Sequence, residues 1–140
     1  MPEAEAAAWV AAEWVTRAED DLKNAAHTLR LGQAGPTGTV CFHAQQCVEK
    51  YLKAYLAWQG VPFPKTHEIE QLVSLMPVKA RPTLSAVEQA ALSEYAIGPR
   101  YPGWRDVALF EARRSVALAR QVRQHVRSLL PKAALSRRKP

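Results

Sequence analysis

Apolar side chains recur at alternating steps of three and four residues along several stretches of this 140-residue chain. That spacing is typical of helices with one buried face, whereas the strict alternation that marks a strand is nearly absent. Clusters of proline and glycine separate the stretches, near residues 32–38, 60–64, 77–82 and 98–103. The pattern therefore predicts an all-α fold.

We expect long helices over residues 3–31, 37–59 and 107–130, and shorter ones over 66–76 and 83–97. Thr66 and Asp106 precede two of these segments and are suited to cap them, because their side-chain oxygens can accept from free backbone N–H groups. The prediction is an antiparallel helical bundle of four to five helices. Its short helices are inserted between the second and the last long ones.

A chain of this length is expected to form one domain. We assign residues 1–131 to the helical domain and residues 132–140 to a basic, flexible C-terminal tail. No apolar run approaches the ~20 residues that a membrane helix needs. The start of the chain is acidic, with Glu3 and Glu5, where a signal peptide would be basic. These features predict a cytoplasmic protein with no membrane segment.

The stretch 37–59 is apolar around most of its circumference. Cys41, Val48 and Tyr55 belong to one stripe, and Val40 and Cys47 widen it. A helix of this kind lies at the centre of a bundle or across a dimer interface. We expect a homodimer that packs largely through the second and the last helices.

Charge is distributed unevenly along the chain. The net charge is +6, yet no acid follows Glu111, and nine Lys and Arg residues lie between positions 113 and 139. The remainder carries ten basic against thirteen acidic residues, a net charge of −3, and its acids crowd near the N-terminus. This polarity suits a surface that attracts phosphate, or an acidic helix that pairs with a basic one inside the fold.

The cysteines and histidines do not have the spacing of a metal site. Cys41 and His43 lie roughly 200° apart around a helix, so they cannot ligate one ion. Cys41 and Cys47 lie about 9 Å apart along the helix axis, which excludes a disulfide between them. The glycines of residues 32–38 follow no strand and precede no Lys-Ser/Thr pair, so they do not form a phosphate-binding loop. The sequence predicts no metal and no cofactor.

A polar seam interrupts the second helix. His43, Gln46, Lys50 and Lys53 share one helix face, where two ammonium groups and an imidazole can hold phosphate. The alternative is structural: Glu49 precedes Lys53 by four residues and can pair with it, and lysine stems can lie along apolar surface.

The loop Arg100–Arg105 is the second candidate. Pro99 and Pro102 restrict its backbone, and it presents two guanidinium groups with the aromatic rings of Tyr101 and Trp104, suited to stack a base and hold its phosphate. Alternatively, the rings close the end of the bundle and Arg100 pairs with an acid. If seam and loop converge, His43, Lys50, Lys53 and Arg100 form one positive cleft, and Lys53→Ala or Arg100→Ala weakens binding without affecting the fold.

Three blocks of the sequence resemble the HEPN family (higher eukaryotes and prokaryotes nucleotide-binding). They are the segment Cys41–Ala54 (CFHAQQCVEKYLKA), the segment Lys65–Ile69 (KTHEI) and Arg100-Tyr101-Pro102. The resemblance extends from about Trp14 to Arg127. It implies a small helical bundle that dimerises, binds nucleotide or RNA, and pairs with a minimal nucleotidyltransferase in a toxin–antitoxin arrangement.

The resemblance also implies an alternative function, because many family members are metal-independent ribonucleases. These use an Arg-x(4 to 6)-His motif that two subunits bring together at the dimer cleft. Arg100 matches the arginine in position, but no histidine follows it within seven residues. Arg120 and His125 match the spacing, although they lie about 140° apart on a regular helix. The hypotheses are thus a nucleotide- or RNA-binding module, a ribonuclease with Arg100, Arg120 or His125 in its site, and a purely structural partner.

Overall fold

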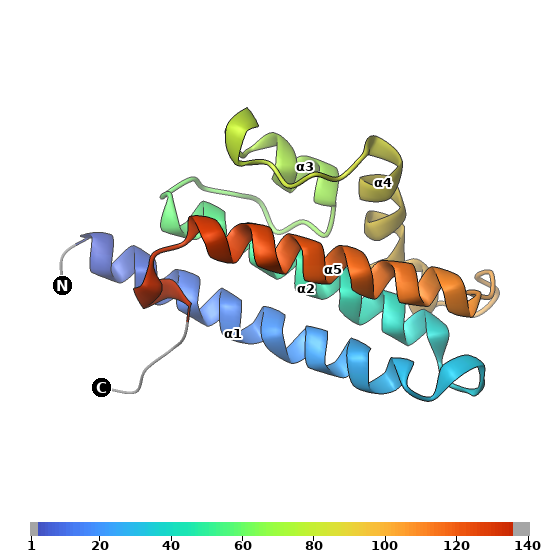
Figure 1. Cartoon of the computed structure of the whole chain (residues 1–140). Coiled ribbons are helices and arrows are strands. Elements are labelled where there is room, and N and C mark those ends of the chain that lie inside the picture. The colour runs from blue at the N-terminus through green and yellow to red at the C-terminus, as the bar shows by residue number, and fades with distance from the viewer. Residues whose placement is uncertain (1–2, 136–140) are drawn as a thin grey trace.

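The computed structural model describes residues 3–135, and all regular secondary structure in that range is helical, with no strand. Its α-helices are α1 (Glu3–Leu29), α2 (Thr37–Trp58), α3 (Ile69–Ser74), α4 (Ala86–Tyr95) and α5 (Leu109–Leu129). Short 3-10 turns lie between or after them: η1 (Gly32–Ala34), η2 (Val78–Ala80), η3 (Gly98–Arg100) and η4 (Lys132–Ala134). The predicted all-α bundle, with short helices inserted before the last long one, is confirmed (Figure 1).

The three long helices lie side by side, and α3 and α4 cover one flank of them (Figure 1). α1 runs antiparallel to α2, to which a short connection joins it. α5 runs in the same direction as α2, because the inserted segment carries the chain back to the end of the bundle where α2 begins. α1 is therefore antiparallel to both of its long neighbours.

α2 forms the centre of the bundle. It packs against α1, α3, α4 and α5, and its buried residues therefore lie on every side of the helix. The apolar circumference that the sequence shows is thus covered within a single chain, which is the first of the two expected explanations. No helix in the described range is long and apolar enough to span a membrane.

Small side chains set the contact between α1 and α2. The α1 residues that are buried are mostly alanines, namely Ala8, Ala11, Ala12, Ala18 and Ala25. Alanine side chains let two helix backbones approach closely, which favours a tight contact along the whole length of α1. The same contact places Asp21, a buried polar residue of α1, directly beside α2.

Several helix ends differ from the expected ones. Ser85 caps α4, with its Oγ accepting from the N–H of Glu88 at 3.0 Å while the Glu88 carboxylate accepts from the N–H of Ser85. α5 begins at Leu109 after Ala108, so Asp106 does not cap it. α3 begins at Ile69, whose N–H donates to Ser93 Oγ of α4 at 2.8 Å.

The packed chain extends beyond residue 131, the expected end of the domain. η4 contacts α1, and Ala134 is fully buried there. The chain is not a basic tail at this point because its apolar residues reach back to the bundle. The rest of the expected tail, residues 136–140, lies outside the described residues.

Candidate functional site

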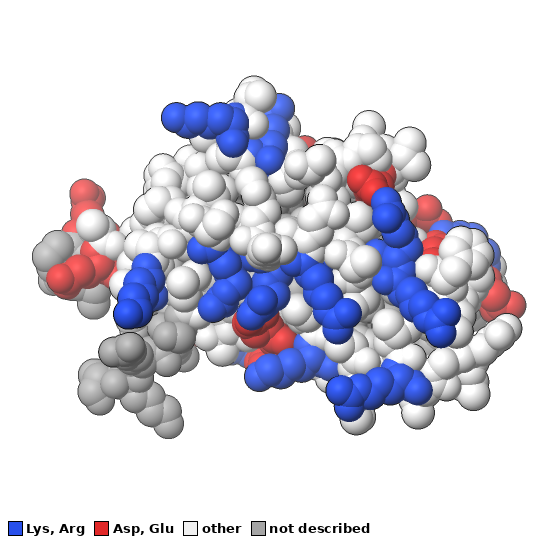
Figure 2. All heavy atoms as spheres, in the orientation of Figure 1, with Lys and Arg blue, Asp and Glu red and all other residues white. Residues whose placement is uncertain are grey.

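Basic side chains gather on the face where α5 and α1 lie beside each other (Figure 2). The charges of α5 come from the acid-poor C-terminal third of the sequence. Glu19 of α1 forms ion pairs with both Arg123 and Arg127 of α5. Pairing between the acidic and the basic helix therefore occurs, but it uses only part of the positive charge.

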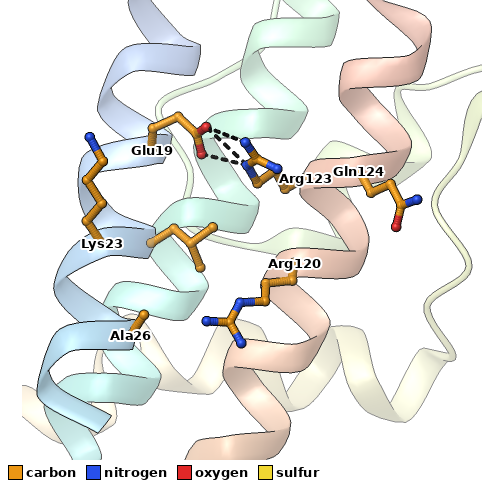
Figure 3. Close-up of a pocket in the computed structure, with 7 residues that line it drawn as sticks. Glu19, Lys23, Ala26, Arg120, Arg123 and Gln124 are labelled. Carbon is orange, nitrogen blue, oxygen red and sulfur yellow. Dashed lines mark hydrogen bonds and ion pairs between the residues drawn. The ribbon is translucent and has the colours of Figure 1, made fainter. Parts of the chain in front are cut away.

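A groove of about 640 Å³ runs between these two helices. α1 contributes Glu19, Leu22, Lys23 and Ala26, and α5 contributes Arg120, Arg123 and Gln124. Leu22 and Ala26 give it a short apolar stretch between the polar groups. In Figure 3, Lys23 and Arg120 belong to opposite helices, with the Glu19–Arg123 pair at one end of the groove.

The side chains of Glu19 and Arg123 hold each other in position. The guanidinium of Arg123 donates three hydrogen bonds to the Glu19 carboxylate at 2.9–3.0 Å. Burial raises the pKa of Glu19, but hydrogen bonds from Arg123 and Tyr51 and the nearby arginine charges outweigh it and hold that pKa below its usual value. Glu19 thus remains ionised at neutral pH and neutralises Arg123.

Lys23 and Arg120 are not neutralised in this way. Neither side chain makes a hydrogen bond or an ion pair with any other residue in the range 3–135. An ammonium and a guanidinium face the same groove, with the amide of Gln124 as a further donor. Such a set of donors suits a phosphate group, because charge-assisted hydrogen bonds to phosphate oxygens are stronger than neutral ones.

Two residues of the predicted seam, His43 and Lys50, meet at a carboxylate that sequence reasoning did not assign to them. His43 Nδ1 lies 2.9 Å from Asp21 Oδ1, and Lys50 Nζ lies 2.6 Å from Asp21 Oδ2. Asp21 belongs to α1 and is almost completely buried. The acid offsets the positive charge of the seam at this point, so a phosphate would have to compete with it.

Lys53 lies in a separate buried cluster. Its Nζ is 2.9 Å from Glu49 Oε2, and the ring centres of Trp14 and Phe63 lie 5.4 and 5.9 Å from it. Glu49 Oε1 also lies 2.8 Å from His67 Nδ1. Lys53 is only 6% exposed, so the structural alternative for this residue, pairing with Glu49, is what the structure shows.

Arg100 and Tyr101, the two loop residues expected to bind, have different neighbours. The guanidinium of Arg100 lies 5.5 Å from the ring centre of Phe42 on α2, the residue before His43. Tyr101 lines a pocket at the end of the bundle. The five expected binding residues, His43, Lys50, Lys53, Arg100 and Tyr101, therefore do not line one cleft. His43 and Lys50 share Asp21, whereas the other three lie in different surroundings.

The two residues of the Arg-x(4)-His spacing face different neighbours. Arg120 lines the groove against α1, whereas His125 Nε2 lies 2.7 Å from the backbone oxygen of Ala80 in η2. The angle between them on α5 separates them within one chain. Arg100, on η3, contacts Phe42 rather than either of these two residues.

The described residues contain no cluster of three or more His, Cys, Asp or Glu side chains that could hold a metal ion. Cys41 and Cys47 are buried and free. Burial raises the pKa of the Cys41 thiol to about 11, and it raises the pKa of Cys47 further. Both thiols therefore act as small core side chains.

Sequence reasoning missed Lys23, and it considered Arg120 only as a catalytic candidate. Their spacing gives a partial signal: Lys23 is one turn after Glu19, and Arg120 is nearly one turn before Arg123. A sequence, however, does not state which faces of α1 and α5 meet. The groove follows from that contact.

The comparisons with known proteins agree with this architecture. The HEPN domain family matches residues 11–129, most of the chain. The chain belongs to the HEPN domain family. The expected resemblance is thereby confirmed over the range in which the sequence shows it.

Two solved structures are similar to this HEPN domain. One is TT1696 from Thermus thermophilus, with 27% identity, a TM-score of 0.69, and coverage of 84% of this chain and 96% of that one. The other is ST0689, an archaeal HEPN homologue, with 23% identity, a TM-score of 0.65, and coverage of 86% and 98%. No curated protein matches the sequence.

Proposed function

We propose that this HEPN domain binds the phosphates of nucleotides or single-stranded RNA in the groove between α1 and α5. The observation that carries the proposal is the pair Lys23 and Arg120, which line one groove from opposite helices and have no partner among residues 3–135. Arg123 contributes less because Glu19 already accepts from its guanidinium.

Single-stranded RNA suits this surface better than a compact metabolite. The groove is open to solvent, and further arginines of α5 extend the positive face along the helix (Figure 2). A basic groove that follows a phosphate backbone is how proteins bind single strands without much sequence preference. The binding is therefore expected to weaken as salt rises.

A binding titration tests the proposal. Fluorescence anisotropy with a labelled single-stranded RNA at low salt would compare the wild type with Lys23→Ala, Arg120→Ala and the double variant. We expect each single variant to weaken binding several-fold, since each removes a charged phosphate contact. Lys79→Ala is the matched control, because this exposed lysine of η2 does not line the groove. Equal affinity of the wild type and the double variant would refute the proposal.

The same proposal includes a homodimer. α2 is covered inside each chain, so a partner copy would contact outer side chains, and the most exposed large ones include Val87 of α4 and Phe110 of α5. The Glu88–Arg114 ion pair joins the neighbouring turns of these two helices. Exposed apolar side chains beside complementary charges are typical of contacts between subunits.

The family resemblance supports a protein partner, a minimal nucleotidyltransferase, in a toxin–antitoxin arrangement. Co-expression with a nucleotidyltransferase encoded next to this gene, followed by size-exclusion chromatography, tests that part. A complex that survives the column supports it, and separate elution of the two proteins at micromolar concentration contradicts it.

A further inference from the structure

A second pocket, of about 500 Å³, opens at the end of the bundle. One wall is the connection from α1 to α2, and the other is the segment 98–107 that leads into α5. Thr37 Oγ1 donates to the backbone oxygen of Val107 at 2.8 Å and ties the two walls together. The pocket is separate from the groove, since the two share no lining residue.

One wall of this pocket carries a fixed indole ring. Trp104 meets Tyr95 edge to face, with ring centres 6.4 Å apart, and the guanidinium of Arg105 lies 4.6 Å from the Trp104 ring centre. A Cβ placed on Gly98 would come within 2.3 Å of this indole. The indole thus packs directly on a backbone that has no side chain there, which holds its position.

Tyr101 is a second aromatic residue that lines this pocket, and unlike Trp104 it is exposed. Its side chain is 60% exposed, and it makes no hydrogen bond and no ring contact with another side chain in the described part of the chain. An exposed aromatic ring at the mouth of a pocket is a surface on which a planar ligand can stack.

The polar groups of the pocket favour a ligand that donates hydrogen bonds. Arg105 is already held by Glu111, with bonds of 2.8 and 2.7 Å, so its charge is not available. Asp106 and Gln33 also line the pocket, and neither side chain has a hydrogen-bond partner among residues 3–135. An unpaired carboxylate repels phosphate and accepts N–H groups instead.

We infer that this end pocket binds an unpaired guanine base, stacked on Tyr101 with its N1–H and 2-amino groups donating to the Asp106 carboxylate. Guanine presents two adjacent N–H donors on one edge, which match the two oxygens of a carboxylate. Adenine and cytosine present one amino group on that edge, and uracil one N–H between two carbonyls. As a statement about RNA, the inference rests on the proposed function: the groove would hold the phosphates and this pocket would select a base.

Two RNA oligomers of equal length, all-uridine and uridine with one central guanosine, test the inference by anisotropy. We expect the wild type to bind the guanosine oligomer about tenfold more tightly, because only guanine donates two adjacent N–H groups to the Asp106 carboxylate. Tenfold is about 1.4 kcal/mol, close to what one hydrogen bond to a charged group contributes. Tyr101→Ala and Asp106→Asn should each remove most of that preference. Tyr101→Phe should keep it, because the ring remains, and so should Asp20→Asn, an equal change of charge at an exposed site outside the pocket.

These titrations test phosphate binding in the groove separately from base binding in the pocket. Lys23→Ala should weaken both oligomers equally and leave their ratio unchanged. Binding that depends on Lys23 but shows no guanosine preference would overturn the inference and leave the proposed function intact. A nucleoside carries no phosphate, so an NMR titration with guanosine, and with uridine as control, tests the pocket even if RNA does not bind. Absence of guanosine-dependent shifts at Tyr101 and Trp104 would also overturn it.

Discussion

Glu19 of α1 accepts three hydrogen bonds, at 2.9–3.0 Å, from the guanidinium of Arg123, a residue that follows it by 104 positions. The pair joins the first and the last α-helix across the end of the basic groove. Arg127 Nη1 lies 3.6 Å from the same carboxylate. The contact thus links helix packing to the electrostatics of the groove.

Glu19→Gln should destabilise the protein in a pH-dependent way. The folded state holds the pKa of Glu19 below the usual value of 4.5, so ionised Glu19 stabilises the fold above that pH. The stabilisation should disappear as the pH falls through the folded pKa. At pH 7 we expect a loss of about 1 kcal/mol, reduced by the partial exposure of Arg123. Urea unfolding at pH 7 and at pH 3 measures it, and a loss of equal size at both pH values would contradict this account.

Lys53→Met should destabilise the fold, contrary to the expectation that removal of this lysine affects binding alone. Glu49 and Lys53 are both almost fully buried, and the variant leaves the carboxylate without its cation. We expect a loss of about 3 kcal/mol in the free energy of unfolding. Lys50→Met, on the same helix but more exposed, is the control and should lose less.

Adding Glu49→Gln to Lys53→Met should restore part of that stability, because no buried charge is left unpaired. Burial raises the pKa of Glu49, and the hydrogen bonds from Lys53, Gln45 and His67 lower it by more. Chemical denaturation of the two single variants and the double variant completes the cycle. Strictly additive losses would show that the two charges do not interact.

Val48→Asp should prevent folding rather than produce a folded monomer. Val48 is fully buried in the α2 core of one chain, and an unpaired carboxylate there costs several kcal/mol.

Phe110→Ser changes a side chain that is 76% exposed, so the helical circular dichroism spectrum should be unchanged. Sedimentation at tens of micromolar should then show a dimer for the wild type and a monomer for Phe110→Ser. A folded Val48→Asp monomer would place the interface on α2 after all.

His125→Ala should leave any RNA cleavage unchanged. The imidazole contacts the backbone of Ala80, while Arg120 faces the groove. Incubation of single-stranded RNA with the wild type, His125→Ala and Arg100→Ala in EDTA measures this directly. Metal-independent cleavage that is lost in the His125 variant would instead support the ribonuclease alternative.

Periodicity is sufficient for the helices but not for all of their ends. The expected 37–59 helix ends at Trp58, within one residue, because its apolar pattern and Gly60 are local signals. The helix expected over 66–76 is shorter: it begins at Ile69, whose backbone N–H donates to Ser93 of α4, and ends at Ser74. The spacing of α4 places Val87 on its apolar side, yet this residue is 79% exposed. Such differences depend on contacts between helices that local patterns do not encode.

The candidate sites, like the helix ends, can be predicted from local sequence only in part. Residue types and spacing identify His43, Lys50 and Lys53 as one helix face, and they do lie on α2. Their partners, Asp21 from α1 and Glu49 within α2, decide whether those charges are available. Asp21 stands among other acids of the N-terminal segment, and only the relative rotation of α1 and α2 selects it.

The two buried thiols of α2 give this protein an internal reporter of its own unfolding. Cys41 and Cys47 lie on the helix that every other α-helix of the described range contacts, so a thiol reagent reaches them only when the bundle opens. The rate of labelling under native conditions then measures how often the centre of the molecule is exposed. Because Cys41 lies nearer the start of α2, unequal rates at the two thiols would show which end of the bundle opens first.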